Sequence, residues 1–114
     1  RAAGLCAEGA NREAVEAVRR EMARLTPEGL RAASSLYAMA DLRKMLADSN
    51  VPFQFLSGDR DRIVPATVVA EHAAALGKVV TELKGVGHAG YVEDSDQFAR
   101  VALAAFAAMP SSSA

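Results

Sequence analysis

The chain has 114 residues, with 13 Lys and Arg against 14 Asp and Glu and a formal net charge of −1. This length allows about one domain. The balanced charge argues against a nucleic-acid-binding protein, which usually carries a basic excess. Hydrophobic residues make up 51% of the chain and charged residues 24%, a composition typical of a globular protein and not of a disordered one.

Several other classes of protein are excluded by the same composition. No uncharged apolar run approaches the roughly 18 residues that span a bilayer, and the start of the chain lacks the apolar core of a signal peptide. We therefore expect a cytoplasmic protein with no membrane partner. The single cysteine excludes an internal disulfide framework. No His, Cys and Asp cluster has metal-ligand spacing, and the glycine-rich loop around His88 is not a G-x-G-x-x-G at the mouth of a first βα unit, the place of a phosphate-binding turn. No metal or other cofactor is therefore expected. The chain does not begin with Met, which leaves open that it is a piece of a longer protein.

The first half of the chain has the periodicity of helices. Between residues 9 and 25, apolar residues recur every three or four positions and charges fill the other face, which predicts an amphipathic helix. Thr26 and Pro27 are typical of a helix start, a hydroxyl cap followed by Pro at the first helical position. Asp41 can cap a third, short helix, whose predicted buried stripe consists of Leu42, Met45 and Leu46.

The second half alternates between strand and helix. A short aromatic run predicts a strand over residues 52–57, although Gln54 is unusually polar for a strand buried on both faces. Pro65 can start a helix that ends at Gly77, and residues 79–83 form a second predicted strand. A glycine-rich loop over residues 85–90 precedes a last helix, with Asp94 and Gln97 in capping-box spacing. The predicted apolar stripe of that helix is Phe98, Val101, Ala102, Ala105 and Phe106.

This alternation predicts an α/β fold with a parallel sheet. A right-handed crossover would place both loops at the carboxyl edge of the strands, where open α/β sheets bind ligands. One loop offers Asp59 and Asp61, and the other offers His88. An acid that accepts the Nδ1–H of an imidazole leaves Nε2 to act as a general base. The alternative is a solvated carboxylate and a surface histidine.

Two of these segments resemble the α/β-hydrolase superfamily. Residues 51–65, V-P-F-Q-F-L-S-G-D-R-D-R-I-V-P, are similar to the seventh strand and its acid-bearing loop. Residues 85–98, G-V-G-H-A-G-Y-V-E-D-S-D-Q-F, are similar to the segment around the catalytic histidine. Residues 40–46 resemble the exit from the cap. The resemblance covers about residues 26–109. It implies the C-terminal part of an α/β-hydrolase fold, with a helical cap portion over 1–50, core over 51–109 and a tail over 110–114.

The resemblance also implies catalytic roles. Asp61 stands in the position of the acid and His88 in that of the base, while Asp59 would stabilise the loop. Ser95 departs from the Pro that the family often has there. The family's nucleophile elbow, usually G-x-S-x-G, is missing, and so is the oxyanion hole. The nearest imitation surrounds Cys6, in G-L-C-A-E. No predicted strand precedes it, and the alternative is a small buried residue.

Three hypotheses follow for the function. The chain could be the C-terminal fragment of an esterase, lactonase or C–C hydrolase that supplies acid and base to a nucleophile elsewhere, with an ester-like small molecule as substrate. Within this first hypothesis, an Asp nucleophile in place of a hydroxyl would make the protein a relative of dehalogenases or epoxide hydrolases. It could instead be an inactive remnant that self-associates, or a module that binds a ligand or protein in the former cleft.

The isolated chain is expected to be inactive and to need a partner. Two parallel strands form a poor sheet by themselves, because three or more strands are usually required for independent stability. That partner would be the missing N-terminal half or a second copy of the chain.

Overall fold

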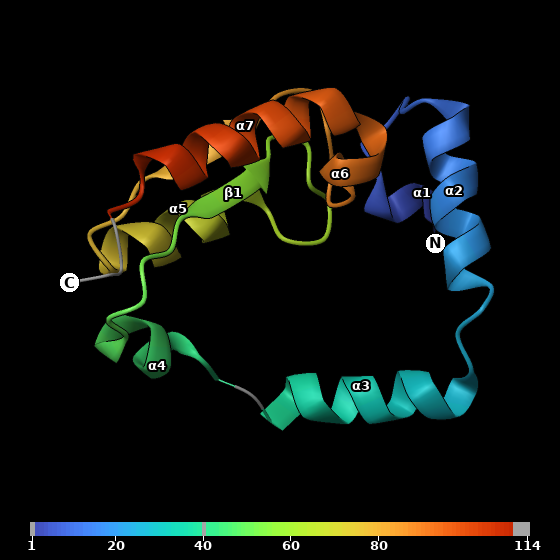
Figure 1. Cartoon of the computed structure of the whole chain (residues 1–114). Coiled ribbons are helices and arrows are strands. Elements are labelled where there is room, and N and C mark those ends of the chain that lie inside the picture. Colours follow the sequence, from blue (N-terminus) through green and yellow to red (C-terminus); the bar gives the residue numbers. More distant parts are fainter. Residues whose placement is uncertain (1, 40, 111–114) are drawn as a thin grey trace.

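A computed structural model describes residues 2–39 and 41–110 (Figure 1). The first half is helical and the second half alternates strand and helix, which fits the predicted α/β class. Within the described ranges no helix is long and apolar enough to cross a membrane. The elements, in chain order, are α1 (Ala2–Leu5), α2 (Arg12–Met22), α3 (Pro27–Met39), α4 (Arg43–Asp48), β1 (Phe55–Gly58), α5 (Ala66–Ala75), β2 (Val80–Leu83), α6 (Gly90–Glu93) and α7 (Ser95–Ala108).

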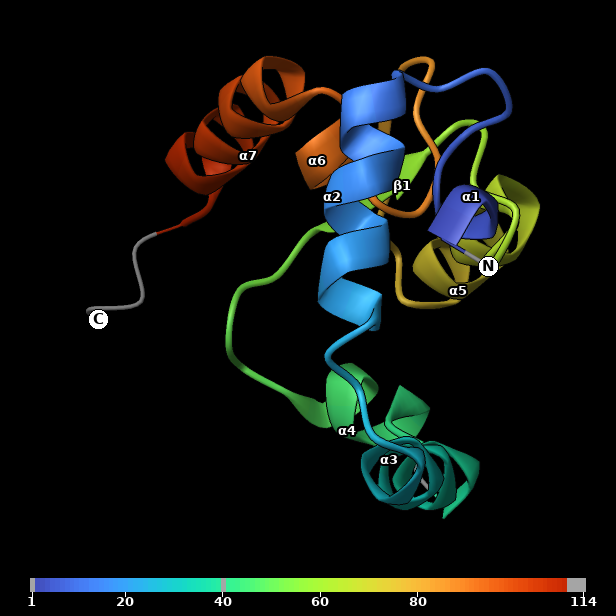
Figure 2. The same ribbon diagram turned by 90° about the vertical axis from the view of Figure 1, so that its right-hand side faces the viewer.

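The sheet of the described chain has two parallel strands, as predicted. Phe55 pairs with Val80 at one end of the ladder and Gly58 with Leu83 at the other. Helix α5 is the crossover between the strands, and it lies on the opposite side of the sheet from α7 (Figures 1 and 2). Each strand therefore has one edge with no strand partner among the described residues. Such an edge exposes backbone N–H and C=O groups that can pair with another strand.

The short helix α1 and the longer α2 pack near the carboxyl ends of the strands, where α2 contacts α6. Asn11 begins α2 by accepting a hydrogen bond from the Glu13 N–H at 2.7 Å. The main cluster of buried apolar side chains lies at this junction, and it joins α1 and α2 to the loop that carries His88. Its buried members are Cys6, Val18 and Ala89.

Helices α3 and α4 pack little against the rest of the chain, and this gives the molecule an open shape. Helix α3 begins as predicted, because Thr26 Oγ1 accepts a hydrogen bond from the Gly29 N–H at 3.0 Å. In Figure 1 it lies across the open side of the molecule, far from the sheet. The Cα radius of gyration is 15.8 Å, against about 13 Å for a compact domain of this length. The accessible surface is 8428 Å², about 2,500 Å² more than a folded monomer of this mass exposes.

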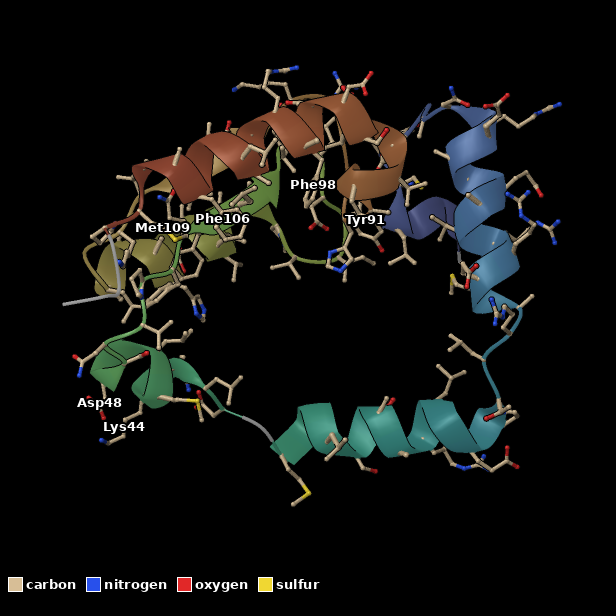
Figure 3. The ribbon with its side chains drawn as sticks, viewed as in Figure 1. Lys44, Asp48, Tyr91, Phe98, Phe106 and Met109 are labelled. Carbon is tan, nitrogen blue, oxygen red and sulfur yellow. The ribbon has the colours of Figure 1, made fainter. Side chains whose placement is uncertain are left out.

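Because the molecule is open, some side chains that the sequence predicts to be buried are exposed. The stripe of α4 is largely exposed, since Leu42 and Met45 are 54% and 64% accessible. Phe106 on α7 is 70% exposed although the helix pattern predicts it to be buried. These side chains have the right spacing for a core face, but no described element covers them. In Figure 3 the ion pair of Lys44 and Asp48 lies on α4, at 2.7 Å between Nζ and Oδ2.

Two polar residues also differ from their predicted places. Gln54 precedes β1 and is not inside the strand, and its Nε2 donates a hydrogen bond to the Ala105 carbonyl of α7 at 3.0 Å. This bond gives a physical reason for a polar residue next to a buried strand. Asp41 lies one residue before the N-cap of α4, where its Oδ1 accepts a hydrogen bond from the Arg43 N–H at 3.1 Å.

Candidate active site

The two loops that follow β1 and β2 are joined by backbone hydrogen bonds. The Asp59 N–H donates to the Leu83 carbonyl at 3.0 Å, and the Arg60 N–H donates to the Val86 carbonyl at 2.9 Å. The Asp59 side chain crosses between the loops as well, since its Oδ1 accepts from the Gly85 N–H at 2.8 Å. Asp59 therefore has a loop-stabilising contact, the role that the resemblance to α/β hydrolases implies for it.

Glycine is required where the loops meet. A Cβ on Gly58 would lie 2.3 Å from the Gly87 carbonyl oxygen and 2.6 Å from that of Val86. Both distances are far below van der Waals contact, and the neighbouring atoms belong to the backbone. Gly85 has a φ of 72°, in the left-handed region that glycine adopts without strain. These glycines bring the end of β1 against the loop that carries His88.

The structure brings Asp61 and His88 together at this edge. Asp61 Oδ2 lies 2.9 Å from His88 Nδ1. Asp61 Oδ1 accepts hydrogen bonds from the backbone N–H groups of Ile63 at 2.8 Å and Val64 at 3.0 Å. The carboxylate is thus fixed through one oxygen and presents the other to the ring. A carboxylate in this position favours the tautomer with the proton on Nδ1.

The pair has the exposure that an acid–base couple needs. The side chain of Asp61 is 8% accessible and that of His88 is 44% accessible. Within the described residues, Nε2 of His88 has no hydrogen-bond partner. The geometry therefore leaves Nε2 able to exchange a proton with another molecule or chain.

The surroundings of Asp61 favour its ionised form. Partial burial would raise the pKa of Asp61, but hydrogen bonds from the Val64 N–H, from His88 and from the Ile63 N–H outweigh it. The pKa of Asp61 is therefore lowered from its ordinary value of 3.8. An ionised carboxylate can orient the imidazole and stabilise an imidazolium beside it.

A cavity of about 270 Å³ opens beside this pair. Tyr91 and Phe98 line it, with ring centroids 6.2 Å apart and edge-to-face geometry (Figure 3). Ser57, at the end of β1, also lines the cavity and is buried. Its hydroxyl contacts the Gly58 carbonyl at 3.5 Å, and no bond joins it to His88. Ser57 therefore does not have the geometry of an activated nucleophile.

Cys6 lies close to the His88 loop but is not placed as a nucleophile. Its side chain is fully buried beside Val18 and Ala89. Burial raises the pKa of the Cys6 thiol, the carboxylate of Glu93 raises it further, and Arg62 opposes both. These effects disfavour the reactive thiolate. The structure agrees with the alternative of a small buried residue.

Among the described residues, the second histidine has no hydrogen-bond partner comparable to Asp61. His72 is exposed on α5, away from the Asp61–His88 pair, where it lines a separate hollow with Arg43 and Phe55. In the parts of the chain that the structure describes, no group of three or more His, Cys, Asp or Glu side chains could hold a metal ion.

The sequence did not indicate that Glu93 and Gln97 hold the loops of the site through side-chain hydrogen bonds to the backbone. Glu93 accepts hydrogen bonds from the backbone N–H groups of Ala7 at 2.8 Å and Gly87 at 2.9 Å. Gln97 completes the predicted cap of α7 by donating its N–H to Asp94 Oδ1 at 3.1 Å. The side chain of Gln97 also bonds both the N–H and the carbonyl of Lys84. Glu93 stands in the histidine motif, but spacing alone does not show which backbone groups it reaches.

Comparison with known proteins finds a similar esterase. The chain is 36% identical over 80 residues to the pimeloyl-[acyl-carrier protein] methyl ester esterase of Xylella fastidiosa (strain M12). The match covers 66% of this chain and 31% of the relative, so the chain spans about a third of that protein's length. No protein-family model matches the chain, and no solved structure matches it either. The likeness to an esterase supports the resemblance to α/β hydrolases that the two motifs carry.

Proposed function

We propose that the chain is the acid- and base-bearing C-terminal part of an α/β hydrolase that cleaves carboxylic esters. The observation that carries this proposal is the hydrogen bond between Asp61 and His88, at 2.9 Å, on the two loops of a parallel sheet edge. The similar protein from Xylella is named as a methyl ester esterase, which favours an ester over the other substrates of the superfamily.

The proposed chemistry follows from the two side chains. Nε2 of His88 takes the proton of a nucleophilic hydroxyl, whose oxygen attacks the ester carbonyl carbon. The imidazolium that forms is stabilised by Asp61 and gives its proton to the departing alkoxide. In the second half of the reaction His88 takes a proton from water, and the hydroxide attacks the acyl group. The nucleophile leaves with the proton, and the carboxylic acid is released.

The hydroxyl and the oxyanion hole would come from another segment. The presence of such a segment is supported by the accessible surface of this chain, which exceeds that of a folded monomer of this mass by about 2,500 Å². Obligate interfaces bury areas of this size. The unpaired edge of β1 would give that segment a strand to join. We infer that turnover requires this segment and that the chain by itself is inactive.

A chimera tests the proposal. This chain would replace the matched stretch of the Xylella esterase, and hydrolysis of a short-chain p-nitrophenyl ester would be measured. We expect turnover that His88→Ala reduces by at least 10³-fold. His72→Ala is the matched control, since it removes the other histidine, and it should leave the rate unchanged.

The opposite results would contradict the proposal. Undiminished turnover in His88→Ala would remove the role of the base. Turnover by the chain alone that disappears in Cys6→Ala would show a nucleophile within these residues.

A further inference from the structure

The backbone of residues 5–7 is bonded to the immediate neighbours of both proposed catalytic residues. Arg62, which follows Asp61, donates from Nη2 to the Cys6 carbonyl at 2.7 Å. Ala89, which follows His88, donates its N–H to the Leu5 carbonyl at 2.8 Å. A segment more than 50 residues away in sequence therefore contacts the acid loop and the histidine loop at once.

Glu93 closes this arrangement with a single carboxylate. Its Oε1 accepts from the Ala7 N–H at 2.8 Å, and its Oε2 accepts from the Gly87 N–H at 2.9 Å. Gly87 immediately precedes His88. Hydrogen bonds to a charged acceptor are shorter and stronger than neutral ones, so the half-buried Glu93 holds residues 5–7 against the histidine loop.

The backbone of residues 5–7 lies so close to Gly87 that no side chain fits between them. A Cβ on Gly87 would lie 2.6 Å from the Ala7 nitrogen and 2.7 Å from the Cys6 carbonyl carbon. Cys6 itself is fully buried. The histidine loop is rich in glycine, which has a large conformational freedom to lose on ordering. External bonds are thus needed to keep such a loop in one conformation.

We propose that Glu93 is a positioning residue that keeps His88 in register with Asp61 by clamping residues 5–7 to the histidine loop. This inference rests on the proposed roles of Asp61 and His88. The clamp acts on the backbone on both sides of the imidazole and does not touch the reacting atoms. Loss of the clamp would release the ring from Asp61, so that the proton would no longer be confined to Nδ1.

The tautomer of His88 gives a direct test that needs no turnover. The 15N chemical shifts of the His72 and His88 rings would be recorded by NMR on the chimera with the Xylella esterase, which supplies the proposed partner segment, at a pH where the rings are neutral. In the wild type we expect His88 to be in the Nδ1–H form. Glu93→Gln can accept through one oxygen only, and it should shift His88 to a mixture of tautomers while the His72 signals stay in place. Glu13→Gln removes one carboxylate from the exposed face of α2, and it should change neither ring.

A second pair of variants tests the clamp without changing charge. Gly87→Ala keeps the carboxylate of Glu93 but forces residues 5–7 away, and it should give the same selective change in His88. Gly4→Ala is the matched control, because a Cβ there meets no atom within 4 Å. If Glu93→Gln unfolds the chain, which displaced His72 signals would reveal, Gly87→Ala decides.

The results separate the clamp from the proposed function. An Nδ1–H tautomer that persists in both Glu93→Gln and Gly87→Ala would overturn the positioning role and leave the Asp61–His88 pair intact. Global unfolding in both variants would overturn it too, because a local clamp should spare α5 and His72. Absence of the Nδ1–H form in the wild type would refute the pair itself, and with it both proposals.

Discussion

Substitution of Gly58 by Ala tests the close approach of the two site loops. The added Cβ would lie 2.3 Å from the Gly87 carbonyl oxygen, where contacts below 3.0 Å are essentially never seen. The two backbones would have to separate by about 0.7 Å, the difference between these distances. Neither atom belongs to a flexible side chain, so no rotation of a neighbouring residue can relieve the overlap.

The expected cost combines strain and a weakened hydrogen bond. Overpacking of a rigid site costs about 1–3 kcal/mol. Moving the histidine loop away also stretches the bond from the Arg60 N–H to the Val86 carbonyl, now 2.9 Å, and a lost bond of this kind costs about 0.5–1.5 kcal/mol. We therefore expect Gly58→Ala to lower the free energy of unfolding by about 1.5–4.5 kcal/mol, against the roughly 5–15 kcal/mol typical of a domain.

Urea denaturation of the chimera with the Xylella esterase, followed by far-UV circular dichroism, measures this cost. The matched control is Gly4→Ala in α1, where a Cβ meets nothing within 4 Å. Alanine is a better helix former than glycine by up to about 1 kcal/mol, so the control should be neutral or slightly stabilising. A Gly58→Ala variant with the denaturation midpoint of the wild type would refute the close approach on which the site geometry depends.

Three further predictions concern other parts of the structure. Gln97→Ala removes both bonds to the Lys84 backbone, at 2.6 and 2.9 Å, and should cost about 1–3 kcal/mol of unfolding free energy; the exposed Asp96→Ala is the control, and equal urea midpoints for the two would contradict the prediction. The Cys6 thiol is buried and its pKa is raised, so an aromatic disulfide reagent should react with it slowly in the native chain and rapidly in urea; fast native reaction would argue against its burial. The pKa of Asp61 is lower in the folded state than its ordinary value of 3.8, so its contribution to stability is present above pH 3.8 and is lost as the pH falls through the folded pKa. In Asp61→Asn the free energy of unfolding should therefore fall less steeply as the pH is lowered through this range. A pH dependence equal to that of the wild type would show that the carboxylate has no such partners.

Local signals in the sequence predicted the elements well. The hydroxyl of Thr26 and the carboxylate of Asp94 cap the helices that they were expected to cap. Gly77, at a φ of 68°, follows the end of α5 as predicted. Caps and stops of this kind depend on residues within a few positions of one another. They can therefore be read without knowledge of the tertiary structure.

Burial was harder to predict because it depends on what covers a face. The spacing of Met45 and Phe106 is that of a core stripe, yet both side chains are exposed in this chain. Periodicity shows which side of a helix is apolar, and only packing shows whether another element lies against it. The proposed partner segment would have to cover these faces. The division at residues 50 and 109 into cap, core and tail stays a prediction.

The sequence by itself determined the α/β class, the order of the elements, and the residue types available at the sheet edge. Asp59, Asp61 and His88 could be chosen as candidates because each follows a strand whose neighbour is parallel, and parallel strands bring their carboxyl ends together. The resemblance to α/β hydrolases then selected Asp61 as the acid. Only the tertiary structure decided that Asp61 reaches Nδ1, that Cys6 is buried, and that Glu93 joins residues 5–7 to the histidine loop. The physical reason is that these contacts involve side chains and join groups up to 86 residues apart, so no local pattern fixes their distance.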